Sequence, residues 1–279
     1  GIAWAGDRWI AGGSNATRIV QTRPWGDLKP LLLNRWTMLG LPAVPGNPLV
    51  ANAFAGFDPA DYPNAWSVYA YDPAVREYRQ LPPTDRISQD TGYWIIDEGN
   101  VVHPVQLTAP ATATPVVFSA GCPSLSGCYE IPLTAPSGTD AYLFQLVGMP
   151  FPYPVGWWEV RLDVDGIAYP LDAQPAAYVE KHYWVWNGND YDTYDSGTPG
   201  SVGLLPPWQS VWIKVWAAGQ GHTLKLLIPR LPKYSQVPPL PTRAPSPLAR
   251  AGWGGGWLRA LDWLIPAAVA AGTPTTPPR

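Results

Sequence analysis

The sequence predicts an all-β fold of two tandem β-sandwich-like modules, followed by a Pro-rich extended tail that carries a short amphipathic helix. Three observations support this prediction. The chain contains 27 glycines and 35 prolines among 279 residues, which interrupts long helices and excludes a helical bundle. Two segments follow one plan, and their apolar residues alternate with the two-residue period of a β-strand.

The internal repeat consists of three matching blocks. The first copy has residues 36–42 (WTMLGLP), then 66–71 (WSVYAY) with Tyr78, then 91–96 (TGYWII). The second copy has residues 144–150 (FQLVGMP), then 182–188 (HYWVWNG) with Tyr191, then 209–215 (QSVWIKV). The offset between the copies is 108 residues at the opening and 118 at the close, which indicates one loop insertion between matching strands.

Each block is predicted to be a strand. In the block 66–71, alternation places Trp66, Val68 and Ala70 on one face and Ser67, Tyr69 and Tyr71 on the other. In the last block, Val211, Ile213 and Val215 share a face, and Lys214 marks the opposite face as the wetter one. Asn187-Gly188 predicts a hairpin turn, and Asp72-Pro73 predicts another turn.

The chain divides into five predicted parts. They are an N-terminal strand segment (1–33), a first β-module (34–107), a connector (108–127), a second β-module (128–230) and a Pro/Gly-rich tail (231–279). Further strands are expected at 101–107, 116–119 and 129–133, separated by Pro and Gly.

Cys122 and Cys128 are bounded by turn-forming residues that bring two sulfurs together. We favour a disulfide over free thiols, and a disulfide indicates an oxidising compartment. Closing so short a loop contributes about 2 kcal/mol, so the bond would stiffen a turn rather than hold the fold.

The tail has two predicted sections. Six of the twenty residues in 231–250 are proline, which is typical of an extended linker. Trp257, Leu258 and Leu261 then follow at helical spacing before Pro266, which ends the short amphipathic segment. A helix this short needs a surface to lie on, either on its own chain or on a neighbouring subunit.

Charge and motifs exclude several function classes. The net charge of −3 without a basic block argues against a nucleic-acid partner. The uncharged stretch 263–271 is too short to span a bilayer, so no membrane-spanning segment is expected. The three histidines His103, His182 and His222 are scattered, and the carboxylates of Asp165 and Asp190 are interpreted as solvated turn residues rather than calcium ligands. We therefore expect no catalytic residues, no metal and no cofactor.

The opening block 36–42 together with residues 91–94 (TGYW) resembles the "GWNLVSLP … GYWV" modules that recur in large secreted and surface-anchored bacterial proteins. The resemblance covers roughly residues 30–100 and 128–230. The second copy departs from the pattern with Phe144 in place of the opening Trp and Ser210-Val211 in place of Gly-Tyr. The resemblance implies an accessory, carbohydrate-associated or purely structural domain outside the cytoplasm.

Aromatic residues provide the main chemical signal. The 16 Trp and 14 Tyr include rings within predicted strands, such as Trp66, Trp94 and Trp212, for which a core or a seam between modules is the simpler use. Other residues lie in loops or in the tail and are predicted to contact a partner: Trp157, Trp158, Trp208, Trp253, Trp257, Leu258 and Leu261.

These features predict a structural subunit of an extracellular or cell-surface assembly, such as a filament, sheath or layer. It would self-associate, or bind another surface protein, through aromatic loops and the tail. The alternative is a carbohydrate-binding module of a larger surface protein, with a glycan as its partner, because flat Trp and Tyr faces stack on sugars.

Overall fold

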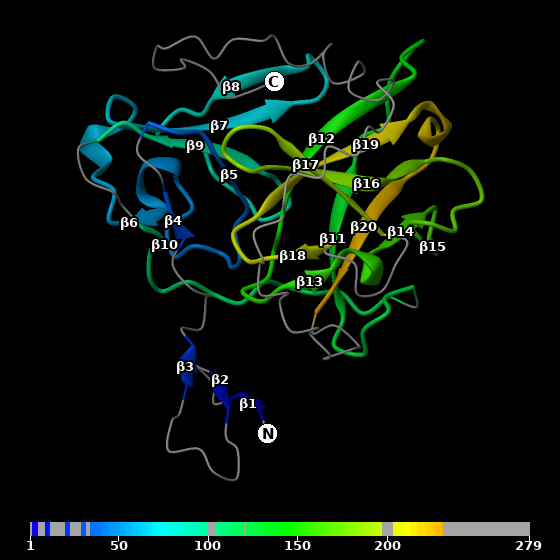
Figure 1. Ribbon diagram of the computed structural model, residues 1–279, viewed down its shortest axis with the longest axis horizontal. Coiled ribbons are helices and arrows are strands. Elements are labelled where there is room, and N and C mark those ends of the chain that lie inside the picture. The colour runs from blue at the N-terminus through cyan, green and yellow to red at the C-terminus, as the bar shows by residue number, and fades with distance from the viewer. Residues whose placement is uncertain are drawn as a thin grey trace, which may run out of the picture. The chain divides into compact units, whose positions relative to one another are not determined.

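The computed structural model describes residues 2–4, 9–11, 20–22, 29–31, 34–99, 104–119, 121–196 and 203–230 (Figure 1). The predicted all-β class is confirmed for these residues, since every regular element is an antiparallel strand or a three-residue 3-10 turn. The predicted tail at 231–279, with its linker and amphipathic helix, lies outside the described residues. The four 3-10 turns are η1 (Val50–Asn52), η2 (Pro59–Asp61), η3 (Trp157–Glu159) and η4 (Ala217–Gly219).

The N-terminal segment contributes to two sheets. One has the order β1-β2-β3, with strands β1 (Ile2–Trp4), β2 (Trp9–Ala11) and β3 (Val20–Thr22). The other has the order β4-β10-β6, with strands β4 (Lys29–Pro30), β10 (Pro104–Leu107) and β6 (Phe54–Ala55). Strand β4 therefore extends a sheet of the first module, which joins the predicted N-terminal segment to that module.

The first repeat is built around a four-stranded sheet of order β5-β9-β7-β8. Its strands are β5 (Thr37–Leu39), β9 (Tyr93–Asp97), β7 (Trp66–Asp72) and β8 (Glu77–Gln80). Trp66 and Val68 are buried in the core of this repeat, with Ala70 packed against it, as the alternation predicts. Tyr69 and Tyr71, from the other face, pack on Trp36 and Trp212.

The second repeat has the equivalent sheet in the order β12-β19-β16-β17. Its strands are β12 (Tyr142–Gly148), β19 (Ser210–Trp216), β16 (Val179–Trp186) and β17 (Tyr191–Asp195). A second sheet, of order β11-β20-β14-β15, covers one face. It contains β11 (Cys128–Leu133), β20 (Leu224–Pro229), β14 (Arg161–Val164) and β15 (Ile167–Pro170), and a small ladder joins β13 (Val155–Gly156) to β18 (Leu204–Leu205).

Strand pairing confirms the internal repeat residue by residue. Met38 pairs with Trp94 in the first repeat, and Leu146 pairs with Trp212 in the second. The hairpins match too, since Tyr71 pairs with Tyr78 where Trp186 pairs with Tyr191. The strand order is therefore shared by the two copies, and so is the register at these pairs, as the offsets in the sequence predict.

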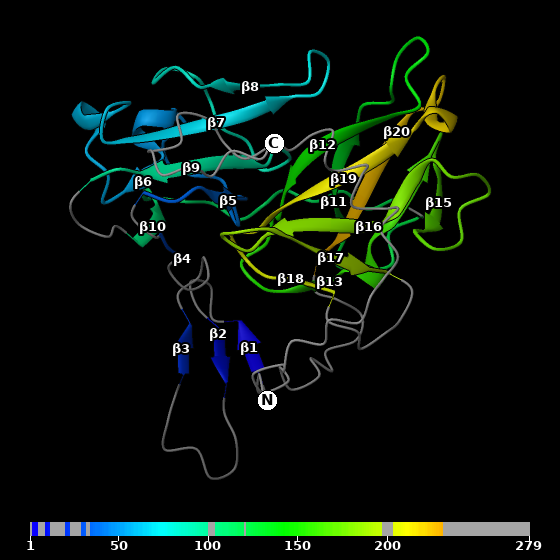
Figure 2. The ribbon, with the colours of Figure 1, turned by 45° about the horizontal axis from the view of Figure 1, so that its top comes forward.

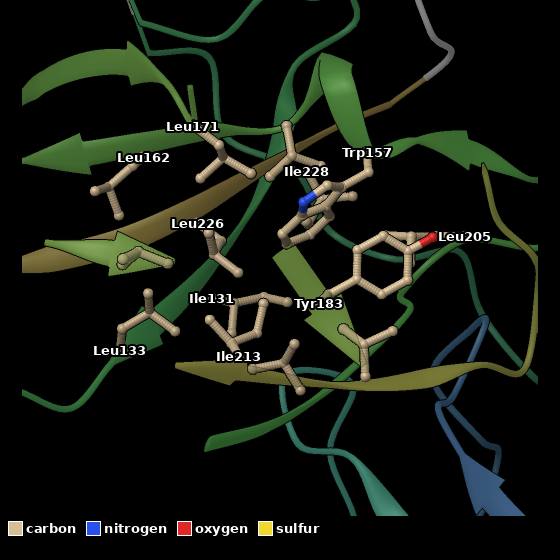
Figure 3. Packing of buried hydrophobic residues seen from close by; sticks show 14 of the residues in the cluster. Ile131, Leu133, Trp157, Leu162, Leu171, Tyr183, Leu205, Ile213, Leu226 and Ile228 are labelled. Carbon is tan, nitrogen blue, oxygen red and sulfur yellow. The ribbon is translucent and has the colours of Figure 1, made fainter. Parts of the chain in front are cut away.

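Each repeat has its own core. In the second repeat, Val211, Ile213 and Val215 point into the sandwich, as predicted, and Ile213 lies near Tyr183 and Ile131 (Figure 3). Figure 1 places β12, β19 and β16 between the sheet of the first repeat and the strands β20 and β14, and Figure 2 also places β12 and β19 between that sheet and β20. One face of the sheet β12-β19-β16-β17 is thus covered by its own second sheet, and part of the other face is covered by the sister repeat.

The connector is held at several points. Val44 and Thr112 form an antiparallel bridge on the first repeat. The Thr114 hydroxyl then donates to the carbonyl of Pro150, and the Gln89 amide donates to both Thr114 and Pro150. The strand predicted at 116–119 is wrong in extent, because only Val117 forms a bridge, with Cys128. Turn-forming residues around this segment limit its strand pairing to that one bridge.

Candidate association surfaces

The sheets of the two repeats meet through an aromatic layer, which we call the inter-repeat interface. It contains Tyr71, Tyr78 and Trp94 from the first repeat and Trp186, Tyr191 and Trp212 from the second. The Trp94 and Trp186 ring centroids are 6.0 Å apart, and those of Tyr71 and Trp212 are 4.8 Å apart. The seam predicted from the strand tryptophans is therefore present.

The inter-repeat interface has an approximate twofold relation. By strand register, Trp94 is equivalent to Trp212, and Tyr71 is equivalent to Trp186. The pair Trp94–Trp186 is therefore the twofold equivalent of the pair Trp212–Tyr71. Strand contacts are reciprocal too, because β5 lies against β16 and β19, while the equivalent β12 lies against β7 and β9. The chain is in effect a covalently joined dimer with an isologous interface.

The equivalent residues Tyr78 and Tyr191 meet close to this approximate axis. Their side chains are hydrogen-bonded to each other, and the Trp212 indole N–H also donates to the Tyr191 hydroxyl at 3.3 Å. Burial raises the pKa of both phenols above the usual value of 10.0. Both rings are therefore neutral and fixed at the centre of the interface.

Two equivalent glycines allow the repeats to approach closely. A methyl group on Gly40 would lie 2.3 Å from the Gln209 carbonyl oxygen, and one on Gly148 would lie 2.7 Å from the Thr91 carbonyl oxygen. The obstacles are backbone atoms of the opposite repeat, which cannot rotate away. The glycine in each opening block is thus explained by the approach of the sister repeat.

The loop tryptophans predicted to contact partners have different positions. Trp157 is completely buried beside Tyr183 in the second core, with ring centroids 4.9 Å apart (Figure 3). Trp208 is 3% exposed and inserts into the core of the first repeat, although it belongs to the second. The prediction is wrong for these two indoles, because the loops that carry them fold inward.

Of the other predicted contact residues, the structure describes Trp158 alone. Trp158 is half-buried, beside Gly156. Trp253, Trp257, Leu258 and Leu261 lie outside the described residues.

The disulfide between Cys122 and Cys128 is confirmed, with an S–S distance of 2.08 Å. Its loop is tied to the end of β20, since the Arg230 N–H donates to the Gly127 carbonyl at 2.9 Å. Apolar side chains project outward on this loop and just before it: Leu125 is fully exposed, Phe118 is 76% exposed, and Val117, which precedes Phe118 and pairs with Cys128, is also exposed. We call these three residues the disulfide-loop patch. Sequence reasoning missed it, because single apolar residues in a turn-rich connector show no periodicity.

Contrary to the prediction from the sequence, Lys214 does not lie in a solvent-exposed environment. Its side chain is 8% exposed, and its ammonium nitrogen lies 3.7 Å from the Trp216 ring centroid and 4.2 Å from that of Tyr142. Burial lowers the pKa of this ammonium, and the charge of Glu180 opposes that change. Alternation assigned the face correctly, but the rings around the lysine exclude water from it.

Within the described ranges, no group of three or more His, Cys, Asp or Glu side chains is arranged to hold a metal ion. The same part of the chain contains no helix long and apolar enough to cross a bilayer. Comparison of the chain with family models, with curated proteins and with solved structures finds no match in any of the three.

Proposed function

We propose that this protein is a structural subunit of an extracellular or cell-surface assembly, and that it contacts a second copy of itself through the disulfide-loop patch. The observation that carries the proposal is the exposure of Leu125, on the loop closed by Cys122–Cys128, and of Phe118, in the segment just before that loop. Large apolar side chains that a rigid loop presents to water favour association, because little conformational entropy is lost on binding.

Three further features support this function. The disulfide fits an oxidising compartment, and the opening blocks resemble modules of secreted bacterial proteins. The inter-repeat interface joins both modules into one compact unit, which suits a load-bearing building block. The tail residues Trp253 and Trp257 are proposed as the second contact, which an open assembly needs in addition to one self-complementary patch.

The test is the oligomeric state of the full chain by sedimentation velocity, with negative-stain electron microscopy for extended assemblies. The double variant Phe118→Ser/Leu125→Ser should shift the chain toward monomer. Losing the burial of two large side chains costs about 3 kcal/mol, which is about a hundredfold in the dissociation constant.

Val75→Ser is the matched control, because Val75 is 63% exposed on the β7–β8 turn, away from the patch. It should leave association unchanged. Truncation after Arg230 tests the tail separately. A full chain that stays monomeric at high concentration, or a double variant that assembles like wild type, would disprove the role of the patch.

A further inference from the structure

The two repeats provide an internal comparison, because a feature that only one of them carries is not required by the shared fold. Several aromatic contacts occur in both copies. Trp36 meets Tyr69 with ring centroids 5.1 Å apart, and the equivalent Phe144 meets Trp184 at 5.5 Å. These contacts therefore belong to the common architecture.

Beyond the inter-repeat interface, the same sheet face differs between the copies. Counting along the matched ladders from Ile95 and Ile213, Lys214 occupies the position of Ile96, and Trp216 that of Glu98. From the opening block, Tyr142 occupies the position of Asn34. The second repeat thus has a lysine among aromatic rings where the first has one aliphatic and two small or charged polar residues.

The backbone differs at the same place. In the first repeat, β7 pairs with β9 without interruption from Trp66 to Ala70. In the second repeat, the register of β16 on β19 shifts between Val179 and Tyr183. Bulges of this kind re-aim side chains and occur next to binding and active sites. The bulged segment contains Glu180 and His182.

Polar side chains on this segment form a linked row across β16 and β17. Glu180 Oε1 lies 3.0 Å from His182 Nδ1, and His182 Nε2 lies 3.2 Å from Asp195 Oδ2. Lys181 Nζ is 3.2 Å from the same Asp195 oxygen. The side chains of His182 and Asp195 remain 34% and 41% exposed, so solvent or a ligand can still reach them.

Partly exposed rings flank this polar row. Trp184, Trp216 and Tyr142 are each half-buried, on β16, β19 and β12. The ring of Phe144 packs edge-to-face against that of Trp184, and Lys214 contacts the rings of Trp216 and Tyr142. The rings are therefore held in place before any ligand arrives, which reduces the entropy lost on binding.

The geometry points to a binding site for a neutral glycan on this face of the second repeat, formed by Trp184, Trp216, Glu180, His182 and Asp195. Sugar rings present C–H faces that pack on indoles and hydroxyl groups that donate to carboxylates. The formal charges of Glu180, Asp195, Lys181 and Lys214 cancel, which favours an uncharged chain over an anionic one. The inference is independent of the self-association proposed above.

The experiment measures binding of cellohexaose, maltohexaose and chitohexaose to the full chain, by calorimetry and by Trp fluorescence, with oligogalacturonate as the anionic comparison. At least one neutral oligosaccharide should bind saturably. Trp184→Ala and Trp216→Ala should each weaken binding at least tenfold, and the conservative Asp195→Asn should do so without removing an aromatic ring.

Trp158→Ala is the matched control, since Trp158 is also half-buried but lies beside Gly156, away from this face. It should bind like wild type, and near-UV circular dichroism should confirm that every variant is folded. Three results would overturn the inference: no binding at millimolar oligosaccharide, binding that the Trp184, Trp216 and Asp195 variants leave unchanged, or binding of oligogalacturonate alone.

Discussion

Replacing Trp94 by alanine tests whether the inter-repeat interface couples the two modules energetically. Trp94 is fully buried, and its ring lies 6.5 Å from Trp36, 6.4 Å from Tyr78 and 6.0 Å from Trp186, centroid to centroid. Truncating a buried tryptophan to alanine costs about 3–5 kcal/mol through lost transfer energy and a residual cavity. Domains have a total stability of about 5–15 kcal/mol, so the variant should fold with a much reduced margin.

Only one of these ring contacts crosses to the sister repeat, and a double-mutant cycle isolates it. The cycle of Trp94→Ala with Trp186→Ala should give a coupling energy of about 0.5–1.5 kcal/mol, the usual range for an aromatic pair. The equivalent cycle of Tyr71→Ala with Trp212→Ala should give a similar value, because strand register makes it the same contact.

Guanidinium chloride unfolding, followed by near-UV circular dichroism, measures these energies. Wild type should unfold in one transition because the modules share their interface, whereas the double variants should approach two separate transitions. The control cycle pairs Trp94→Ala with Val75→Ser, and no coupling is expected since Val75 lies on an exposed turn. Additive effects in both interface cycles, or two transitions already in wild type, would refute the reasoning.

Three other predictions concern the same unit. In the folded chain, the pKa values of the Tyr78 and Tyr191 phenols are raised. Their contribution to stability is therefore complete below pH 10 and is lost as the pH rises through the folded-state pKa values. Absorbance near 295 nm should show that these phenols ionise late, together with alkaline unfolding. Gly148→Ala should destabilise the chain by about 1–3 kcal/mol in thermal unfolding, because its methyl group would overlap a backbone carbonyl; wild-type stability would contradict this contact. Replacing Cys122 and Cys128 by serine should lower stability by only about 2 kcal/mol, yet weaken self-association measured by sedimentation, and equal association would argue against a rigid patch.

The repeats and the strand faces could be predicted from local patterns. Matching blocks, at an offset that grows from 108 to 118 residues along the repeat, correctly paired Tyr78 with Tyr191 and the glycine of one opening block with that of the other. Two-residue alternation separated Val68 from Tyr69, and the short Cys spacing indicated the disulfide. These properties depend on neighbouring residues, so a linear sequence contains them.

The environment of each ring could not be predicted in the same way. Trp157 and Trp208 lie in loops rich in Pro and Gly, which are usually exposed, yet both loops turn inward and fill a core. Phe118, in a similar setting, projects into solvent. Whether a loop folds inward or projects into solvent depends on long-range packing, which leaves no periodic pattern in the sequence.

By itself, the sequence determined the β class, the duplication, the disulfide and which residues share each strand face. Only the tertiary structure decided which strand faces are exposed to solvent. Alternation predicts one buried and one exposed face for an antiparallel sheet, but here the sister repeat covers part of the second face of β12-β19-β16-β17. Lys214 lies on the predicted side of β19 but in a different environment, because the rings of Tyr142 and Trp216 exclude water from its ammonium group, and Tyr142 is distant from it in the sequence.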